Sequence, residues 1–298
     1  MRLAPIAPLF AAAAALAAPV APAAAQSAGD APIVVTGERI TDDEIGAFVE
    51  ALTPTPVGGQ IARFETQICP AALGLPAEQR AAVEARIRLV ADAVGLRVAD
   101  AKCAANVVVM VTRDKKALLA TLGKKYPDFF AGLTPTERKR IRDEPGPVAA
   151  WQAGAVVNAD GQRLAVEEGV AVNRTTRVGS RITAAARPTF AAAAVVVEVA
   201  ALEGLTPTQL ADYVVMRSFA RTEPAKLAAA APATILRVMD APAGTAVPIT
   251  LTEWDYGFLR GLYAAPPNLA APAQRSAIGR TLERQLGGDA DAKDPPRP

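Results

Sequence analysis

The sequence predicts an α+β fold in which a strand-helix-strand unit and a hairpin form a mixed sheet, followed by a mainly helical C-terminal part. Two segments carry most of this prediction. Residues 76–94 begin with proline and place four apolar residues on one helical face, namely Val83, Ile87, Val90 and Val94. Residues 106–112, NVVVMVT, are a β-branched apolar run of strand length, which is typical of a strand buried on both faces.

The other strands follow from weaker patterns. QIARFETQ, residues 60–67, alternates apolar and polar side chains imperfectly between Gly59 and Pro70, and we expect it to be the first strand of a right-handed crossover unit. Residues 149–172 have extended character on both sides of NADG, where Gly161 can supply a positive φ, so a hairpin is expected there.

One capping pattern predicts three later helices. In each, a threonine is followed three residues later by a side chain that can bond back to the cap amide: Thr134 with Glu137, Thr206 with Gln209, and Thr252 with Asp255. A further helix is expected at residues 273–286. Residues 190–205, FAAAAVVVEVAALEGL, contain two glutamates and a valine run, which favours a core strand over a membrane span.

The N-terminus has the pattern of a secretory signal peptide, in which Arg2 precedes an apolar run and a small-residue segment with expected cleavage after Ala25. No later segment is apolar for long enough to span a bilayer. The sequence therefore predicts a periplasmic or secreted protein. The expected parts are a signal peptide at 1–25, an N-terminal segment at 26–58, a single α+β domain at 59–286 with a possible sub-boundary near 205, and a disordered tail at 287–298.

The chain has two cysteines, Cys69 and Cys103. An exported protein matures where thiols oxidise, so we expect these residues to form a disulfide. Such a crosslink would disfavour the unfolded chain by about 3 to 4 kcal/mol. The alternative is two independent buried thiols.

The net charge argues against a nucleic-acid partner. The formal charge of +2 falls to +1 when cleavage removes Arg2. This value is too close to neutral for the long-range attraction to nucleic acid that a strongly basic domain exerts.

The composition excludes several kinds of catalysis. There is no histidine, which removes His-dependent serine and cysteine triads and the common zinc sites. No Gly-rich phosphate loop, Ser-x-x-Lys or Gly-x-Ser-x-Gly motif is present, so we expect neither a metal nor a cofactor.

Carboxylate chemistry remains, as in glycoside hydrolysis by two acids. Asp212 and Asp255 are the candidate catalytic residues, because each lies in an apolar helical stretch where burial would raise its pKa. The structural alternatives are an ion pair with a nearby arginine for Asp212 and helix capping for Asp255.

A basic stretch lies within residues 169–197, which contain no acid. Its four arginines are Arg174, Arg177, Arg181 and Arg187. Together they could hold phosphate or carboxylate groups of an envelope glycan or lipid. The alternative is a solvated loop or strand face.

IVVTGERI, residues 33–40, resembles the TonB box of proteobacterial outer-membrane receptors. In those receptors, an extended segment near the mature N-terminus pairs with the energy-transducing protein by strand addition. The resemblance implies a Gram-negative, periplasm-facing address and, for residues 32–38, a docking role as an accessory of a TonB-dependent system. A simple edge strand of the domain is the alternative.

The order of elements, together with ATILRVMD and LTEWDYGFLRGLY, resembles an uncharacterised family of secreted proteobacterial proteins related to zincin metallopeptidases. In zincins, a helix carries His-Glu-x-x-His, which holds zinc and supplies a general base. Here the motif falls on residues 211–215, where Ala211 and Val215 occupy the ligand positions. The resemblance therefore implies a pseudoenzyme whose fold serves binding or structure.

These observations predict an exported, disulfide-bonded protein that acts as a non-catalytic binding or structural module of the cell envelope. Its expected partner is an envelope protein or an anionic envelope component. The alternatives are a metal-independent hydrolase that uses Asp212 or Asp255 on an envelope glycan, and an accessory of a TonB-dependent system.

Overall fold

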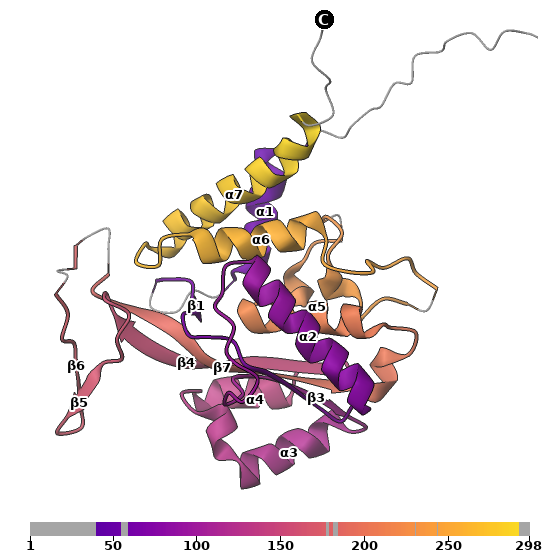
Figure 1. Ribbon diagram of the computed structural model, residues 1–298, viewed down its shortest axis with the longest axis horizontal. Helices are drawn as coiled ribbons and strands as arrows, with labels where there is room; N and C mark the ends of the chain where they lie inside the picture. The colour runs from indigo at the N-terminus through magenta and orange to yellow at the C-terminus, as the bar shows by residue number, and fades with distance from the viewer. Residues whose placement is uncertain are drawn as a thin grey trace, which may run out of the picture. The chain divides into compact units, whose positions relative to one another are not determined.

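The computed structural model describes residues 40–54, 59–176, 179–180, 184–229, 231–242 and 244–291 (Figure 1). The expected signal peptide and residues 32–38 lie outside these ranges. In the ranges described, no helix combines the length and the apolar character that crossing a bilayer requires.

The elements follow one another in a mixed order of helices and strands. They are α1 (Asp42–Leu52), β1 (Arg63–Phe64), β2 (Pro70–Leu73), α2 (Ala77–Ala93), β3 (Val107–Thr112), α3 (Lys115–Lys125), η1 (Pro127–Phe130), α4 (Pro135–Arg142), β4 (Val148–Asn158), β5 (Ala165–Glu167), β6 (Val170–Val172), β7 (Ala186–Glu198), η2 (Val199–Leu202), α5 (Pro207–Phe219), η3 (Pro224–Lys226), η4 (Ile235–Arg237), α6 (Glu253–Ala264) and α7 (Ala271–Asp291).

A mixed sheet is built around β7, which confirms the predicted α+β fold class. The core strand expected at residues 190–205 is confirmed over residues 190–198, and the chain then forms η2. On one side, β4 pairs antiparallel with β7 along its whole length. On the other side, β1 and then β3 pair with β7 in parallel, and β2 pairs in parallel with β3. β4 therefore forms one edge of this sheet, and β2 and the short β1 form the other.

Helices cover both faces of the sheet (Figure 1). α2 and α5 lie on one face, and α3 and α4 lie on the other. α6 lies on the α2 and α5 side, with α1 and α7 beyond it. β7 contributes to both cores, because Val195 and Val197 belong to the cluster with α2 and α5, whereas Ala194 and Val196 belong to the cluster with α3 and α4.

The expected first strand at residues 60–67 is wrong in extent and in partner. Only Arg63 and Phe64 form β1, and they pair with β7 rather than with the strand that follows α2. The strand-helix-strand unit is formed by β2, α2 and β3 instead. Proline is tolerated at the first position of a strand, so Pro70 begins β2 rather than ending the strand before it.

The chain turns at NADG, and one antiparallel bridge joins Val157 to Arg163 across the turn, but the longer strands on either side pair elsewhere. Gly161 has φ 83°, and its N–H donates to the carbonyl oxygen of Asn158 at 3.0 Å. β4, which ends there, has 11 residues and pairs with the 13 residues of β7, whereas β5 has only three.

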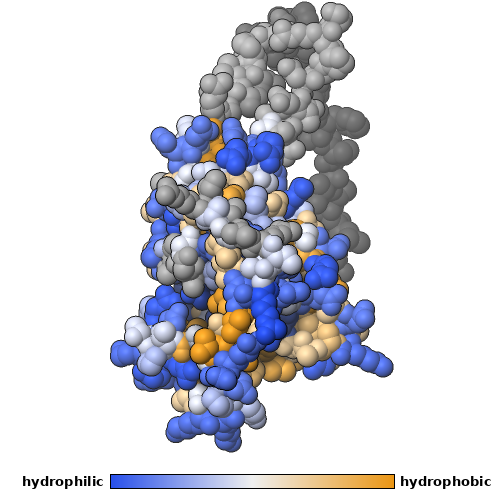
Figure 2. Space-filling view, turned by 90° about the vertical axis from the view of Figure 1, so that its left-hand side faces the viewer, coloured by the Kyte–Doolittle hydropathy of each residue, from blue (hydrophilic) through white to orange (hydrophobic). Residues whose placement is uncertain are grey.

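The local hairpin is formed by β5 and β6, which pair only with each other. It carries two exposed valines, Val166 at 74% and Val170 at 64%. The face of the molecule seen in Figure 2 is largely hydrophilic, with an apolar patch in its lower half.

All three predicted capping boxes are present at the starts of α4, α5 and α6. A fourth begins α1, where the Thr41 hydroxyl accepts from the Glu44 N–H and the Glu44 carboxylate accepts from the Thr41 N–H. Ile45, Phe48 and Leu52 of α1 are buried in the main core.

These findings correct the expected domain limits at both ends. Because α1 packs against α7, the folded unit includes residues that were placed in the N-terminal segment 26–58. At the other end, α7 continues to Asp291, beyond the expected helix end at Leu286 and into the expected tail 287–298.

The predicted disulfide between Cys69 and Cys103 is confirmed, with the two sulfur atoms 2.00 Å apart. Cys69 directly precedes β2, and Cys103 lies in the loop that leads to β3. Because these strands are parallel neighbours, the disulfide joins the chain at the points where β2 and β3 begin, at the same end of the two strands.

Candidate functional site

Asp212 is fully buried and holds three parts of the chain together. Arg86 of α2 donates to both carboxylate oxygens, from Nε at 2.7 Å and from Nη2 at 3.0 Å. The Thr250 hydroxyl donates at 2.7 Å and the Leu251 N–H donates at 2.9 Å. The carboxylate therefore links α5 to α2 and to the loop before α6. This is the structural alternative expected for Asp212, an ion pair with an arginine, although Arg86 is 126 residues away in the sequence.

We expect Arg86→Met and Asp212→Asn each to lower the free energy of unfolding by about 2 kcal/mol, because each leaves the other group without its ionic partner. Arg86 is 26% exposed, so solvent screens part of the interaction. In a double-mutant cycle by urea unfolding, the double variant should lose about 1 kcal/mol less than the sum of the two single losses. Additive losses would show that the two side chains are not coupled.

Asp255 is also fully buried, and it receives four hydrogen bonds. Two come from the Thr252 N–H and hydroxyl at the start of α6, at 3.1 and 3.0 Å. The others come from the Thr234 hydroxyl at 2.5 Å and the Ile235 N–H at 2.8 Å, at the start of η4. Burial raises the pKa of Asp255, although the hydrogen bonds act in the opposite direction. The side chain thus caps two helical segments.

Of the four arginines of the basic stretch, the structure describes Arg174 and Arg187, which bind different acidic side chains. Arg187 is 7% exposed, and its guanidinium bonds to both oxygens of Glu65 at 2.6 and 2.7 Å and to the side chain of Asn268. Arg174 is exposed and pairs with Glu167. Arg177 and Arg181 lie outside the described residues. Arg187 is therefore a structural residue rather than an anion ligand.

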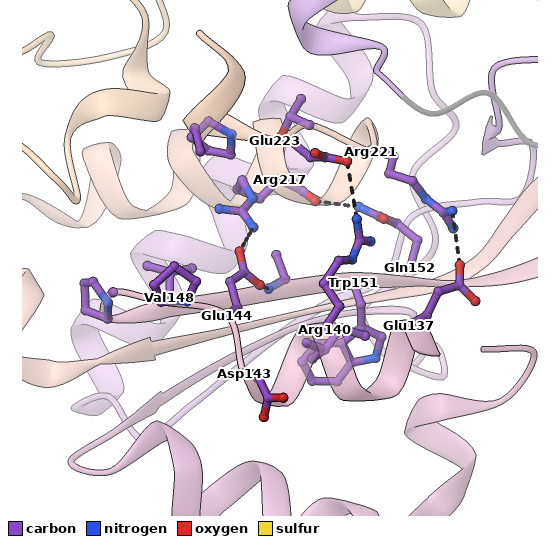
Figure 3. Close-up of a pocket in the computed structure, with 18 of the residues that line it drawn as sticks. Glu137, Arg140, Asp143, Glu144, Val148, Trp151, Gln152, Arg217, Arg221 and Glu223 are labelled. Carbon is purple, nitrogen blue, oxygen red and sulfur yellow. Dashed lines mark hydrogen bonds and ion pairs between the residues drawn. The ribbon is translucent and has the colours of Figure 1, made fainter. Parts of the chain in front are cut away.

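A cleft of about 690 Å³ lies beside the outer edge of β4 (Figure 3). One wall consists of α4 and residues 143–147, and the other consists of the end of α5 and the residues up to η3. Val148, Ala150 and Gln152 of β4 lie between the walls. Because α4 and α5 cover opposite faces of the sheet, the cleft is the gap between these two helices at the sheet edge.

Three ion pairs connect the two walls of this cleft (Figure 3). They join Arg217 to Glu144 at 2.8 Å, Arg221 to Glu137 at 3.6 Å, and Arg140 to Glu223 at 3.3 Å. They differ in exposure, since the side chain of Arg217 is 6% exposed and that of Arg140 is 57% exposed. Solvent therefore screens the pair of Arg217 and Glu144 less than the other two, and the exposed pair contributes little to stability.

Two buried groups of the lining are hydrogen-bond donors. Arg217 donates from Nη1 to the Tyr213 hydroxyl oxygen at 2.8 Å, and its Nε has no acceptor among the residues described. Burial raises the pKa of Tyr213 to about 12. Tyr213 therefore keeps its proton at neutral pH, which makes it a donor and not a base.

The lining carries both signs of charge. Its basic side chains are Lys139, Arg140, Arg217 and Arg221, and its acidic side chains are Glu137, Asp143, Glu144, Glu223 and Asp240. The balance is close to neutral, so the cleft suits a ligand with both donors and acceptors better than it suits a polyanion. Neither Asp212 nor Asp255 lines it.

The sequence indicates this cleft only weakly. Residues 137–144, ERKRIRDE, have the pattern of an exposed helical face. The one available signal is the spacing of four that places Tyr213 and Arg217 on one side of α5.

The zincin-like positions Ala211 and Val215 are buried within α5. Throughout the described ranges, no group of three or more acidic, histidine or cysteine side chains is arranged to hold a metal ion.

No protein-family model, curated protein or solved structure matches this chain. The resemblances to the TonB box and to zincin-related proteins therefore remain predictions. The function has to be inferred from the cleft and from the two buried carboxylates.

Proposed function

We propose that this protein is an exported binding module of the cell envelope and that its ligand site is the cleft beside β4. The observation that carries the proposal is the lining, in which buried donors of Arg217 and Tyr213 face a volume of about 690 Å³. Sites for small ligands and short segments have volumes of about 300 to 1,000 Å³ and contain a few well-placed polar groups.

The positions of the two candidate acids support binding over catalysis. Asp212 and Asp255 are enclosed by structural donors, and both lie away from the cleft. The hydrolase alternative therefore has no supporting observation in the fold. The accessory role in a TonB-dependent system rests on residues 32–38 alone.

The expected ligand is an envelope protein segment or another envelope component with donors and acceptors. The near-neutral lining does not favour a strongly anionic glycan or lipid, and it does not favour nucleic acid.

Thermal unfolding in the presence of envelope extracts tests this proposal. The mature chain would be mixed with peptide, glycan or lipid fractions, together with two variants. Ala225→Trp places an indole at an exposed position of the cleft lining, and Ala81→Trp places one on an exposed position of α2. We expect one fraction to raise the Tm of the natural chain and of Ala81→Trp by about 5 °C at saturation.

The same fraction should leave the Tm of Ala225→Trp unchanged. An equal shift in all three proteins would place the ligand outside the cleft. No shift with any fraction would remove the support for a binding function.

A further inference from the structure

We infer that the cleft binds an extended peptide segment, which adds to the sheet as a strand along the free edge of β4. This inference rests on the proposed function, because it names the ligand of the same cleft. Three observations support the inference. Backbone groups of β4 point into the cleft, the Glu144 carboxylate accepts from one of them, and two walls flank the strand.

Alternate residues of β4 direct their backbone groups into the cleft. The N–H of Glu198 donates to the carbonyl oxygen of Pro147 at 2.9 Å, which fixes the bonded pairs of the ladder. In an antiparallel pair, these alternate with pairs whose N–H and C=O groups point away from the partner strand. With the observed register, Ala149 and Trp151 bond toward β7, whereas Ala150 and Gln152 face the cleft.

Glu144 occupies the place where a neighbouring strand would supply a carbonyl oxygen. One of its carboxylate oxygens accepts from the Ala150 N–H at 3.3 Å, and the other pairs with Arg217 at 2.8 Å. The first bond is long, so an incoming backbone carbonyl can replace it while Glu144 keeps its ion pair. For Gln152, no backbone partner on the cleft side is present among the described residues.

The available edge has defined limits. At one end, Lys115 donates to the carbonyl oxygen of Val148 at 3.3 Å and closes the strand there. At the other end, the loop at Gly132 lies so close to Gly154 that an added Cβ would meet the Gly154 carbonyl oxygen at 3.0 Å. The open edge between these closures therefore fits about five extended residues, at roughly 3.3 Å each.

The two walls suit the alternating side chains of such a segment. Successive side chains of a strand point to opposite faces of the sheet. Those on one face would meet Glu137 and Arg140 of the α4 wall, and those on the other would meet Arg217 and Arg221. In the structure, Arg221 pairs with Glu137 and Arg140 pairs with Glu223 across the cleft, so a bound strand has to separate these two pairs. The separated groups would then face the peptide, so we expect charged side chains of either sign on it.

Amide hydrogen exchange by NMR tests the inference with a defined probe. The probe is a pool of acetylated and amidated pentapeptides that are randomised among Gly, Val, Thr, Lys and Glu. We expect the pool to slow exchange of the Ala150 and Gln152 amides by about tenfold or more. The amides of Ala149 and Trp151 should not change, because they already bond to β7.

Two controls separate strand addition from other modes of binding. The same pool with N-methyl groups on two adjacent central residues lacks a donor on each edge and should give no protection. Ala150→Pro removes a cleft-facing N–H without removing a ladder bond, and a folded variant should lose the effect.

Uniform protection of all four amides, or protection by the methylated pool, would overturn strand addition. Absence of protection would also overturn it and would assign Glu144 the role of covering the edge against association. If an envelope fraction still stabilises the natural chain and fails with Ala225→Trp, the cleft remains a binding site for another ligand class.

Discussion

Asp255→Ala is expected to lower the free energy of unfolding by about 3 to 4 kcal/mol. The substitution leaves the buried N–H groups of Ile235 and Thr252 without their acceptor, and it removes the Asp255 half of the capping box of α6. Urea unfolding followed by circular dichroism measures the loss. In the exposed capping box of α4, Glu137 has the same position as Asp255 has in α6. Glu137→Ala should lower the free energy of unfolding by about 1 kcal/mol or less.

The contribution of Asp255 to the free energy of unfolding should depend on pH. Burial raises the pKa of Asp255 in the folded state above its value in the unfolded chain. The protonated carboxyl therefore stabilises the fold fully below the unfolded pKa of about 4, and this contribution is lost as the pH rises through the folded pKa. The stability difference between the natural chain and Asp255→Asn should decrease from pH 4 to pH 8, and an increase would contradict the account.

The second large effect is expected from the disulfide. The combined substitution Cys69→Ser and Cys103→Ser should lower the free energy of unfolding by about 3 to 4 kcal/mol, since it frees a loop with a sequence separation of 34. A reductant should destabilise the natural chain by a similar amount and leave the variant unchanged. Equal stability of both proteins with and without reductant would show that the crosslink contributes nothing.

Most of the regular structure could be predicted because its signals are local. The helical spacing in α2 and the apolar run of β3 each predict their element without any other information. The threonine caps do the same for the starts of α4, α5 and α6. The capping box of Thr41 and Glu44 is the same kind of local signal and marks the start of α1 within the expected N-terminal segment 26–58.

Strand partners were less predictable because pairing depends on distant residues. β1 is too short to show a pattern, and its place beside β7 depends on a register with Thr189 and Phe190. β4 pairs with β7 across an insertion that contains β5 and β6. A turn such as NADG indicates where the chain reverses, but not which strand it will meet.

The cleft could not be predicted for the same reason. Arg217 and Glu144 are 73 residues apart, and the partner of Asp212 is 126 residues away. Each of these residues has an ordinary sequence context, and only the fold decides which charges meet. The apolar helical context of Asp212 and Asp255 predicts their burial correctly, but both carboxylates are buried as structural hydrogen-bond acceptors.

The central claim is that a ligand occupies the cleft beside β4 in the native envelope. Photo-cross-linking tests it directly, with p-benzoylphenylalanine at position 225 in the cleft lining or at position 81 on α2. The account predicts one reproducible product from position 225 and none from position 81. No product from position 225, or the same product from both positions, would contradict it.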